Sequence, residues 1–217
     1  MKENLTQIVF ILDRSGSMDN LTNDTIGGFN SFVKAQKEEP GEAMLTTVLF
    51  DDKYEILHDN VNIQDVEPLT SKEYYARGMT ALLDAIGKTI KVVGGQLDKT
   101  KEEDKPSKVI FVITTDGWEN SSKEFIQSQI KEMIKHQQEV YNWEFLFTGA
   151  GIDAVGAAVH FGIKNVGAAV FATPDGIDSL YSGLTKTVSN YRTTGEVAPD
   201  WSNTISESKE KNYAKSK

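Results

Sequence analysis

The sequence predicts an α/β fold, a doubly wound and mostly parallel sheet with helices on both faces. Four short apolar runs, at 7–13, 43–51, 108–116 and 143–151, are nearly continuous and rich in Val, Ile, Phe and Thr. Runs of this kind are typical of strands buried on both faces of a parallel sheet. Segments with apolar residues at helical spacing separate most of them, and such alternation predicts crossover helices on both sides of the sheet.

The first two helices and an edge strand are expected between 20 and 97. In the first helix the apolar positions recur at helical spacing until Pro40-Gly41: Leu21, Ile26, Phe29, Phe32 and Val33. The segment DDKYEILHDNVNI, 51–63, predicts a turn followed by one antiparallel edge strand. A second helix is expected from Thr80, with an apolar stripe that Gly94-Gly95 closes.

The second half of the chain predicts three more helices and a weak strand. A helix is expected in SSKEFIQSQIKEMIKHQQ, 121–138, with Ser121 or Ser122 as its N-cap. Its inward face would consist of Phe125, Ile126, Ile130, Met133 and Ile134. A short helix at 153–162, a weak strand at 164–172 and a last helix at 174–192 follow. Residues 193–217 lack apolar periodicity, so we expect one domain over 1–192 and a flexible C-terminal tail over 193–217.

Composition narrows the class of function. The net charge of −9 argues against a broad basic surface for nucleic acid or anionic lipid, so we expect neither nucleic acid nor a membrane as partner. The absence of cysteine excludes disulfides, thiolate metal sites and a cysteine nucleophile. The N-terminus lacks the pattern of a secretory signal, and a cytoplasmic location is the natural expectation.

Oxygen-bearing side chains gather at the predicted ends of the strands. Asp13 follows QIVFIL and Asp116 follows KVIFVITT, and Ser15 and Ser17 alternate with Asp13 in DRSGSM. Thr80 stands where the second helix begins. In doubly wound sheets ligands bind beyond the carboxyl ends of the strands, where the strand order reverses. Each residue alone also fits a plainer structural role, since Asp and Ser build turns, Thr caps helices and Asp favours helix N-termini.

Taken together, these motifs resemble von Willebrand factor type A domains. DRSGSM is similar to the family's Asp-x-Ser-x-Ser signature, GMTALLDAI to its threonine loop, and ITTDGWEN to its Thr-Asp-Gly segment. The three motifs follow the family's order, and the resemblance covers about Gln7 to Tyr191. It implies a Rossmann-like fold and a metal-ion-dependent adhesion site (MIDAS).

The resemblance also implies a role for each residue of that site. Ser15 and Ser17 would bind the ion directly, and Thr80 directly or through water. Asp13 and Asp116 would act mostly through waters and by hydrogen-bonding the serines. Hydroxyl and carboxylate oxygens are hard ligands that suit Mg²⁺, with Mn²⁺ or Ca²⁺ as alternatives. Neutral serines leave the ion electron-poor, so a partner's Asp or Glu carboxylate would complete its coordination.

Three hypotheses for function follow. The first is a metal-dependent protein-binding module, and the second is a Mg²⁺-dependent hydrolase or phosphoryl-transfer enzyme that uses the same oxygen cluster. The third is a structural component with a vestigial site. We favour the module and expect no enzyme, because the sequence lacks a phosphate-binding loop and a nucleophile elbow, and because its histidines fall in different elements: His58, His136 and His160.

Other residues near these motifs have less specific readings. The residues that flank the predicted ligands should rim the site: Arg14, Met18, Arg77, Met79, Trp118, Glu119 and Asn120. Met18 and Trp118 would either contact a partner or pack beneath the loops. TGAGID, 148–153, favours a tight strand-to-helix turn over a dinucleotide-binding fingerprint, because the third glycine is missing.

Overall fold

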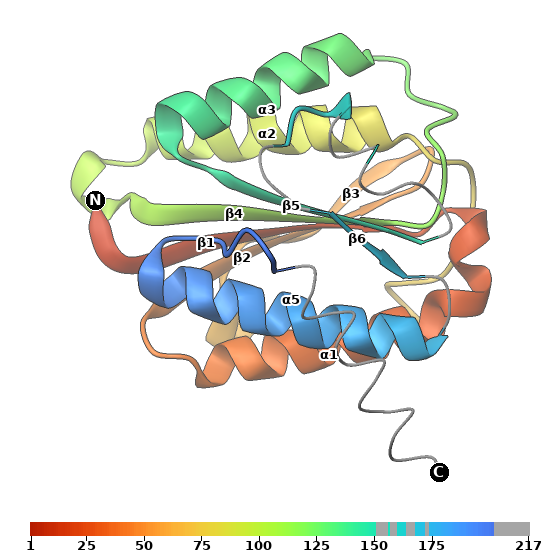
Figure 1. Cartoon of the computed structure of the whole chain (residues 1–217), viewed down its shortest axis with the longest axis horizontal. Helices are drawn as coiled ribbons and strands as arrows, with labels where there is room; N and C mark the ends of the chain where they lie inside the picture. The colour runs from red at the N-terminus through yellow and green to blue at the C-terminus, as the bar shows by residue number, and fades with distance from the viewer. Residues whose placement is uncertain (151–155, 157–159, 164–167, 172–173, 202–217) are drawn as a thin grey trace.

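A six-stranded sheet forms the centre of the structure, a computed structural model that describes residues 1–150, 156, 160–163, 168–171 and 174–201 (Figure 1). The strands are β1 Lys2–Asp13, β2 Glu42–Phe50, β3 Tyr54–Asn62, β4 Pro106–Thr115, β5 Glu144–Ala150 and β6 Ala168–Phe171. The helices are α1 Thr22–Glu38, α2 Leu82–Lys99, α3 Gln127–Tyr141 and α5 Pro174–Thr194. Short 3₁₀ turns lie at Gly16–Leu21, Ile63–Asp65 and Glu102–Asp104.

The sheet has the order β3-β2-β1-β4-β5-β6, and every neighbouring pair is parallel except β2 with β3. The four apolar runs are therefore β1, β2, β4 and β5, and the predicted antiparallel edge strand is β3. The predicted doubly wound, mostly parallel α/β fold is confirmed. The order reverses between β1 and β4, so the ends of these two strands define the switch point of the sheet.

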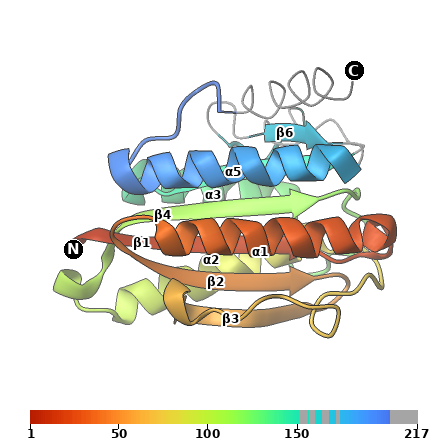
Figure 2. The same cartoon turned by 90° about the horizontal axis from the view of Figure 1, so that it is seen from below.

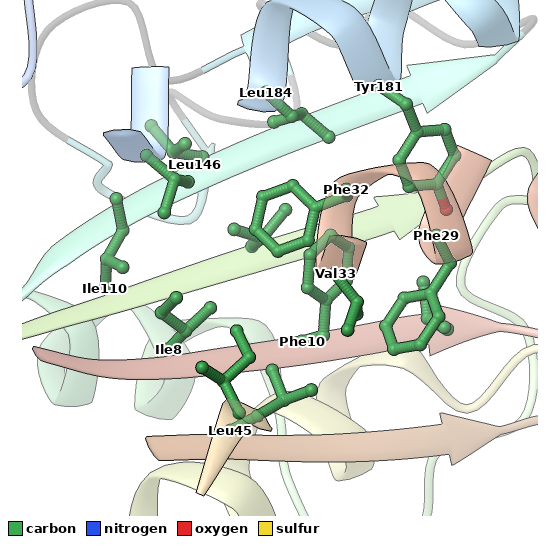
Figure 3. Close-up of a cluster of buried hydrophobic side chains, with 14 of the residues drawn as sticks. Ile8, Phe10, Phe29, Phe32, Val33, Leu45, Ile110, Leu146, Tyr181 and Leu184 are labelled. Carbon is green, nitrogen blue, oxygen red and sulfur yellow. The ribbon is translucent and has the colours of Figure 1, made fainter. Parts of the chain in front are cut away.

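Helices cover both faces, α2 and α3 on one side and α1 and α5 on the other (Figures 1 and 2). Strand β1 is buried on both sides: Phe10 belongs to the core under α1 and α5, whereas Val9 and Ile11 belong to the core under α2 and α3. Figure 3 shows the first of these cores, where the Phe10 ring lies edge-on to Phe29 at 5.4 Å and to Phe32 at 5.0 Å. Aromatic and aliphatic side chains from α1 thus fix that helix on the sheet.

Three details of the predicted helices are wrong. α2 continues through Gly94-Gly95 to Lys99, because a glycine costs a helix only about 1 kcal/mol and the partly buried Leu97 still packs against the core. α3 begins at Gln127, so Ile126 is its N-cap residue and is 63% exposed instead of facing inward. Ser122 is not the cap of that helix; its hydroxyl accepts the backbone N–H of Asp84 in the first turn of α2.

The C-terminal region is described only in part. α5 runs to Thr194, and Trp201 is buried against the core that α1 and α5 cover. Residues 202–217 lie outside the described residues, as do most of the short helix predicted at 153–162 and the second half of TGAGID, so these expectations and the domain boundary at 192 stay predictions. No helix within the described ranges is long and apolar enough to cross a membrane.

Candidate metal centre

The first loop of the centre leaves the carboxyl end of β1. Asp13 is fully buried, and its carboxylate accepts hydrogen bonds from the Ser15 backbone N–H at 2.6 Å and from the Thr115 hydroxyl at 2.5 Å. These bonds curl the chain so that the Ser15 and Ser17 hydroxyls lie 3.1 Å apart. Asp13 therefore shapes the loop, and of the two serines beside it Ser15 is buried whereas Ser17 is exposed.

The second loop brings Thr80 against the first. Thr80 is 3% exposed, and its backbone is clamped by Asn120, whose side-chain oxygen accepts the Thr80 N–H and whose own N–H donates to the Thr80 carbonyl. The Thr80 and Ser17 hydroxyls converge on Gly117. A Cβ atom added to this glycine would lie 2.9 Å from the Thr80 Oγ1 and 3.3 Å from the Ser17 Oγ. Glycine thus keeps open the small space that these hydroxyls surround.

The third loop follows β4 and contributes Asp116. The Ser17 hydroxyl donates to its carboxylate at 2.6 Å, so Ser15, Ser17 and Asp116 form one continuous chain of oxygens. The structure brings all five predicted residues to one edge of the sheet, Asp13 on the buried side and Ser17 on the exposed side. Three of the five are hydroxyl residues, and the described residues contain no cluster of three or more His, Cys, Asp or Glu able to hold a metal.

The charges at the centre fit a bound cation. Burial raises the pKa of Asp13 to about 6, although hydrogen bonds from Thr115 and Ser15 lower it and the nearby Asp116 charge raises it further. Burial also raises the pKa of Asp116 despite the hydrogen bond from Ser17. Within the described residues neither carboxylate forms an ion pair with a lysine, arginine or histidine. Two ionised carboxylates in such surroundings need a counter-charge, and an all-oxygen donor set suits Mg²⁺.

The flanking residues divide into exposed and structural groups. Trp118 and Met79 are 67% and 53% exposed beside the centre, whereas Met18 is buried and packs beneath the loop. Glu119 does not face solvent freely, because its carboxylate accepts N–H groups of Leu83, Ser121 and Ser122. Arg14 is 1% exposed and ion-paired with Asp51, so it lies beneath the exposed rim.

Three residues that support the centre were not predicted from the sequence. Thr115, the second threonine of ITTD, donates to Asp13, and the buried Tyr74 hydroxyl donates to the Asp13 carbonyl. Asp51 follows β2 and is fully buried. The last had a usable signal, since it ends an apolar run just as Asp13 and Asp116 end theirs. Tyr74 lies in an irregular segment with no periodic pattern, so nothing in the sequence marked it.

Comparisons with solved structures identify the fold. A von Willebrand factor type A structure from Catenulispora acidiphila aligns with a TM-score of 0.59 and 15% identity, over 84% of this chain and 42% of that one. The chain has the von Willebrand factor type A fold. The ArnB paralog VWA2 from Sulfolobus acidocaldarius aligns with a TM-score of 0.54 and 19% identity, over 85% of this chain and 45% of that one.

A third type A-like structure carries a metal. Proximal thread matrix protein 1 from the mussel byssus, solved with a zinc-occupied MIDAS motif, aligns with a TM-score of 0.58 and 14% identity, over 84% of this chain and 47% of that one. The present chain spans less than half the length of each of these structures. No protein-family model and no curated protein matches the sequence. At these identities the likeness is one of fold.

Proposed function

We propose that the chain is a metal-dependent protein-binding module whose Mg²⁺ is held by Asp13, Ser15, Ser17, Thr80 and Asp116. The bound ion would supply an electron-poor coordination position for a carboxylate of the partner. Mn²⁺ and Ca²⁺ are alternative occupants, because both also take oxygen ligands. The zinc in the MIDAS motif of proximal thread matrix protein 1 supports a divalent cation on this fold.

The observation that carries the proposal is the hydrogen-bonded chain from Ser15 through Ser17 to Asp116. Its oxygens are preassembled, at 3.1 and 2.6 Å, at the point where the strand order reverses. Asp13 is sealed beneath them by Thr115, while the Ser17 side faces solvent. A partner would therefore approach the ion from the side of the exposed Ser17 hydroxyl.

The surroundings support a protein as the partner. Trp118 and Met79 expose large side chains next to the ligand loops, and exposed aromatic residues are common anchors of protein interfaces. A cavity of about 380 Å³ lies beside Trp118 and is also lined by Leu82, Phe147 and Phe161. These apolar surfaces next to a charged centre suit a protein segment that carries an acid beside an apolar side chain.

We also propose that the module does not act as an enzyme. The carboxylate that follows the ligands in the third loop, Glu119, is engaged by three backbone N–H groups and is not poised as a general base. Turnover of generic phosphomonoesters or nucleotides that disappears in Asp116→Asn would contradict this part of the proposal.

Calorimetric titration with Mg²⁺ tests the metal centre. Wild type and Ser128→Ala, which changes an exposed serine of α3, should bind the ion equally, whereas Ser15→Ala and Asp116→Asn should lose measurable binding. Circular dichroism establishes that all four chains are folded. A pull-down with Mg²⁺ or with EDTA then tests the partner, and retention that ignores EDTA and the Ser15→Ala change counts against a metal-bridged interface. If folded Ser15→Ala bound Mg²⁺ as tightly as wild type, the proposal would be refuted.

A further inference from the structure

A third aspartate at the same edge of the sheet binds two arginines that belong to different ligand loops. Asp51 is fully buried, and its Oδ2 accepts the Arg14 Nε at 3.1 Å and the Arg77 Nε at 2.6 Å. Its Oδ1 accepts the Lys53 backbone N–H at 2.6 Å. Arg14 stands between Asp13 and Ser15, and Arg77 lies three residues before Thr80. One buried carboxylate thus holds a residue of the serine loop and a residue of the threonine loop together.

A second acid and an aromatic ring complete this cluster. Glu55 of β3 pairs with the Arg14 Nη2 at 2.6 Å and with the Arg77 Nη2 at 2.9 Å. The ring of Tyr75 lies 5.8 Å from the Arg14 guanidinium carbon and 5.2 Å from that of Arg77. Two guanidinium groups and two carboxylates give no net charge. This balance matters because Arg14 is only 1% exposed, and a buried charge needs a partner.

Backbone hydrogen bonds join the same two loops beside the cluster. The Arg77 N–H donates to the Arg14 carbonyl at 2.8 Å, and the Gly16 N–H donates to the Gly78 carbonyl at 3.2 Å. The Ala81 N–H donates in turn to the Asp51 carbonyl at 3.0 Å. The chain segments that carry Ser15, Ser17 and Thr80 are therefore linked to each other and to the end of β2.

We propose that Asp51, Arg14, Arg77 and Glu55 form a positioning cluster that sets the ion affinity of the metal centre without touching the ion. The inference rests on the proposed function, since it presumes that the hydroxyls of the two loops share one ion. Groups that orient metal ligands typically change affinity by about 10- to 100-fold when removed. The cluster orients the loops that carry the ligands, and we expect about a tenfold weakening when it is broken.

Charge and positioning predict different results, which makes the cluster testable. Asp51→Asn leaves a net positive charge beside the cation, whereas Arg77→Gln leaves a net negative charge. If only the local field mattered, the first change would weaken Mg²⁺ binding and the second would strengthen it. If loop position matters, both changes weaken it.

Calorimetry with Mg²⁺ alone, on the full chain, measures the effect. Arg192→Gln is the matched control: Arg192 is also a buried arginine, and it donates to the carbonyls of Gln36 and Gly41 at the opposite edge of the sheet. We expect dissociation constants about ten times higher in Asp51→Asn and in Arg77→Gln, and unchanged in Arg192→Gln. Tighter binding in Arg77→Gln, or unchanged binding in both cluster variants, would overturn the inference. Glu55→Gln, at a half-exposed position, replaces Asp51→Asn if that variant does not fold.

A second measurement does not depend on the metal. In EDTA, the amide protons of Gly16 and Arg77 should exchange with solvent faster in Asp51→Asn than in wild type, because their hydrogen bonds span the two loops. Equal exchange rates would show that the cluster does not hold the loops. If wild type binds no Mg²⁺, the proposed function fails, and this exchange experiment alone decides whether the cluster positions the loops.

Discussion

Replacement of Asp13 by asparagine should stabilise the metal-free protein while it abolishes ion binding. Asp13 is fully buried and has no cationic partner among the described residues, so its ionised form is unfavourable in the folded chain. Burial raises its pKa from 3.8 to about 6. Asparagine keeps the size and one acceptor oxygen of this side chain but carries no charge.

The pKa sets the expected magnitude. A shift from 3.8 to about 6 corresponds to about 3 kcal/mol of unfavourable ionisation above pH 6, at about 1.4 kcal/mol per unit. In wild type both carboxylate oxygens of Asp13 accept a hydrogen bond, one from Ser15 and one from Thr115. In Asp13→Asn one of these oxygens becomes an NH₂ group that cannot accept, and the lost hydrogen bond removes part of the gain in stability. We therefore expect Asp13→Asn to raise the free energy of unfolding by about 1–2 kcal/mol in EDTA at pH 7.

The stability difference between Asp13→Asn and wild type should depend on pH. Because the folded-state pKa lies above the unfolded value, folded wild type takes up a proton first as the pH falls through about 6. The contribution of Asp13 to the stability of metal-free wild type therefore becomes less unfavourable as the pH falls from 7 to 4, and the advantage of Asp13→Asn shrinks over the same interval. Saturating Mg²⁺ should reverse the order at pH 7, since an ion at 100 times its dissociation constant adds about 2.7 kcal/mol to wild type alone.

Urea unfolding in EDTA, followed by circular dichroism at several pH values, measures the difference. Asp84→Asn is the matched control, because burial favours the neutral form of Asp84 but three backbone N–H groups outweigh it and lower its pKa. That variant should lose about 1–3 kcal/mol at pH 7. The reasoning is refuted if Asp13→Asn is less stable than wild type in EDTA at pH 7, or if the difference does not change with pH.

Three further substitutions test the surroundings of the centre. Gly117→Ala places a Cβ atom 2.9 Å from the Thr80 Oγ1, so Mg²⁺ affinity measured by calorimetry should fall by about tenfold or more; unchanged affinity would show that this space is not used. Ser122→Ala removes the hydroxyl that accepts the Asp84 N–H and should lower the free energy of unfolding in urea by about 1 kcal/mol, with Mg²⁺ affinity unchanged. Trp118→Ala should leave stability within about 0.5 kcal/mol of wild type. It should also weaken binding of a partner retained in the Mg²⁺ pull-down by about tenfold, measured by surface plasmon resonance.

The sequence predicted most of the fold because the signals involved are local. Strands buried on both faces need continuous apolar runs, and the runs before Asp13 and Asp116 stand out for that reason. The order of motifs then placed both acids at one edge, and β1 and β4 are indeed neighbours there. The predicted N-cap of α3 was wrong because the Ser122 hydroxyl accepts the Asp84 N–H in the first turn of α2 instead. This contact joins residues 38 positions apart, and no local pattern contains it.

The residues that support the site were harder to predict, because their contacts join segments far apart in the sequence. Asp51 looked like a turn residue, and its role depends on Arg14 and Arg77, which lie 37 and 26 residues away. Tyr74 reaches the Asp13 carbonyl across 61 residues. Asp51 can be found from sequence by treating every acid at the end of a buried strand as a candidate for the same edge, whereas no sequence pattern marks Tyr74.

Three aspartates end three central strands, and their surroundings give them opposite energetic roles. Asp51 is matched by guanidinium groups and stabilises the loops as they stand. Asp13 and Asp116 have no such match in the described residues, and burial raises the pKa of both. The loops are therefore held in place before an ion arrives, while the charge at their centre remains uncompensated. That combination would make the proposed ion binding favourable for two separate reasons, since little ordering is needed and an existing electrostatic cost is relieved. A chain whose Asp13 and Asp116 were neutral would fold more stably but bind the ion less tightly. This trade-off between stability and binding is expected for residues that are kept for function.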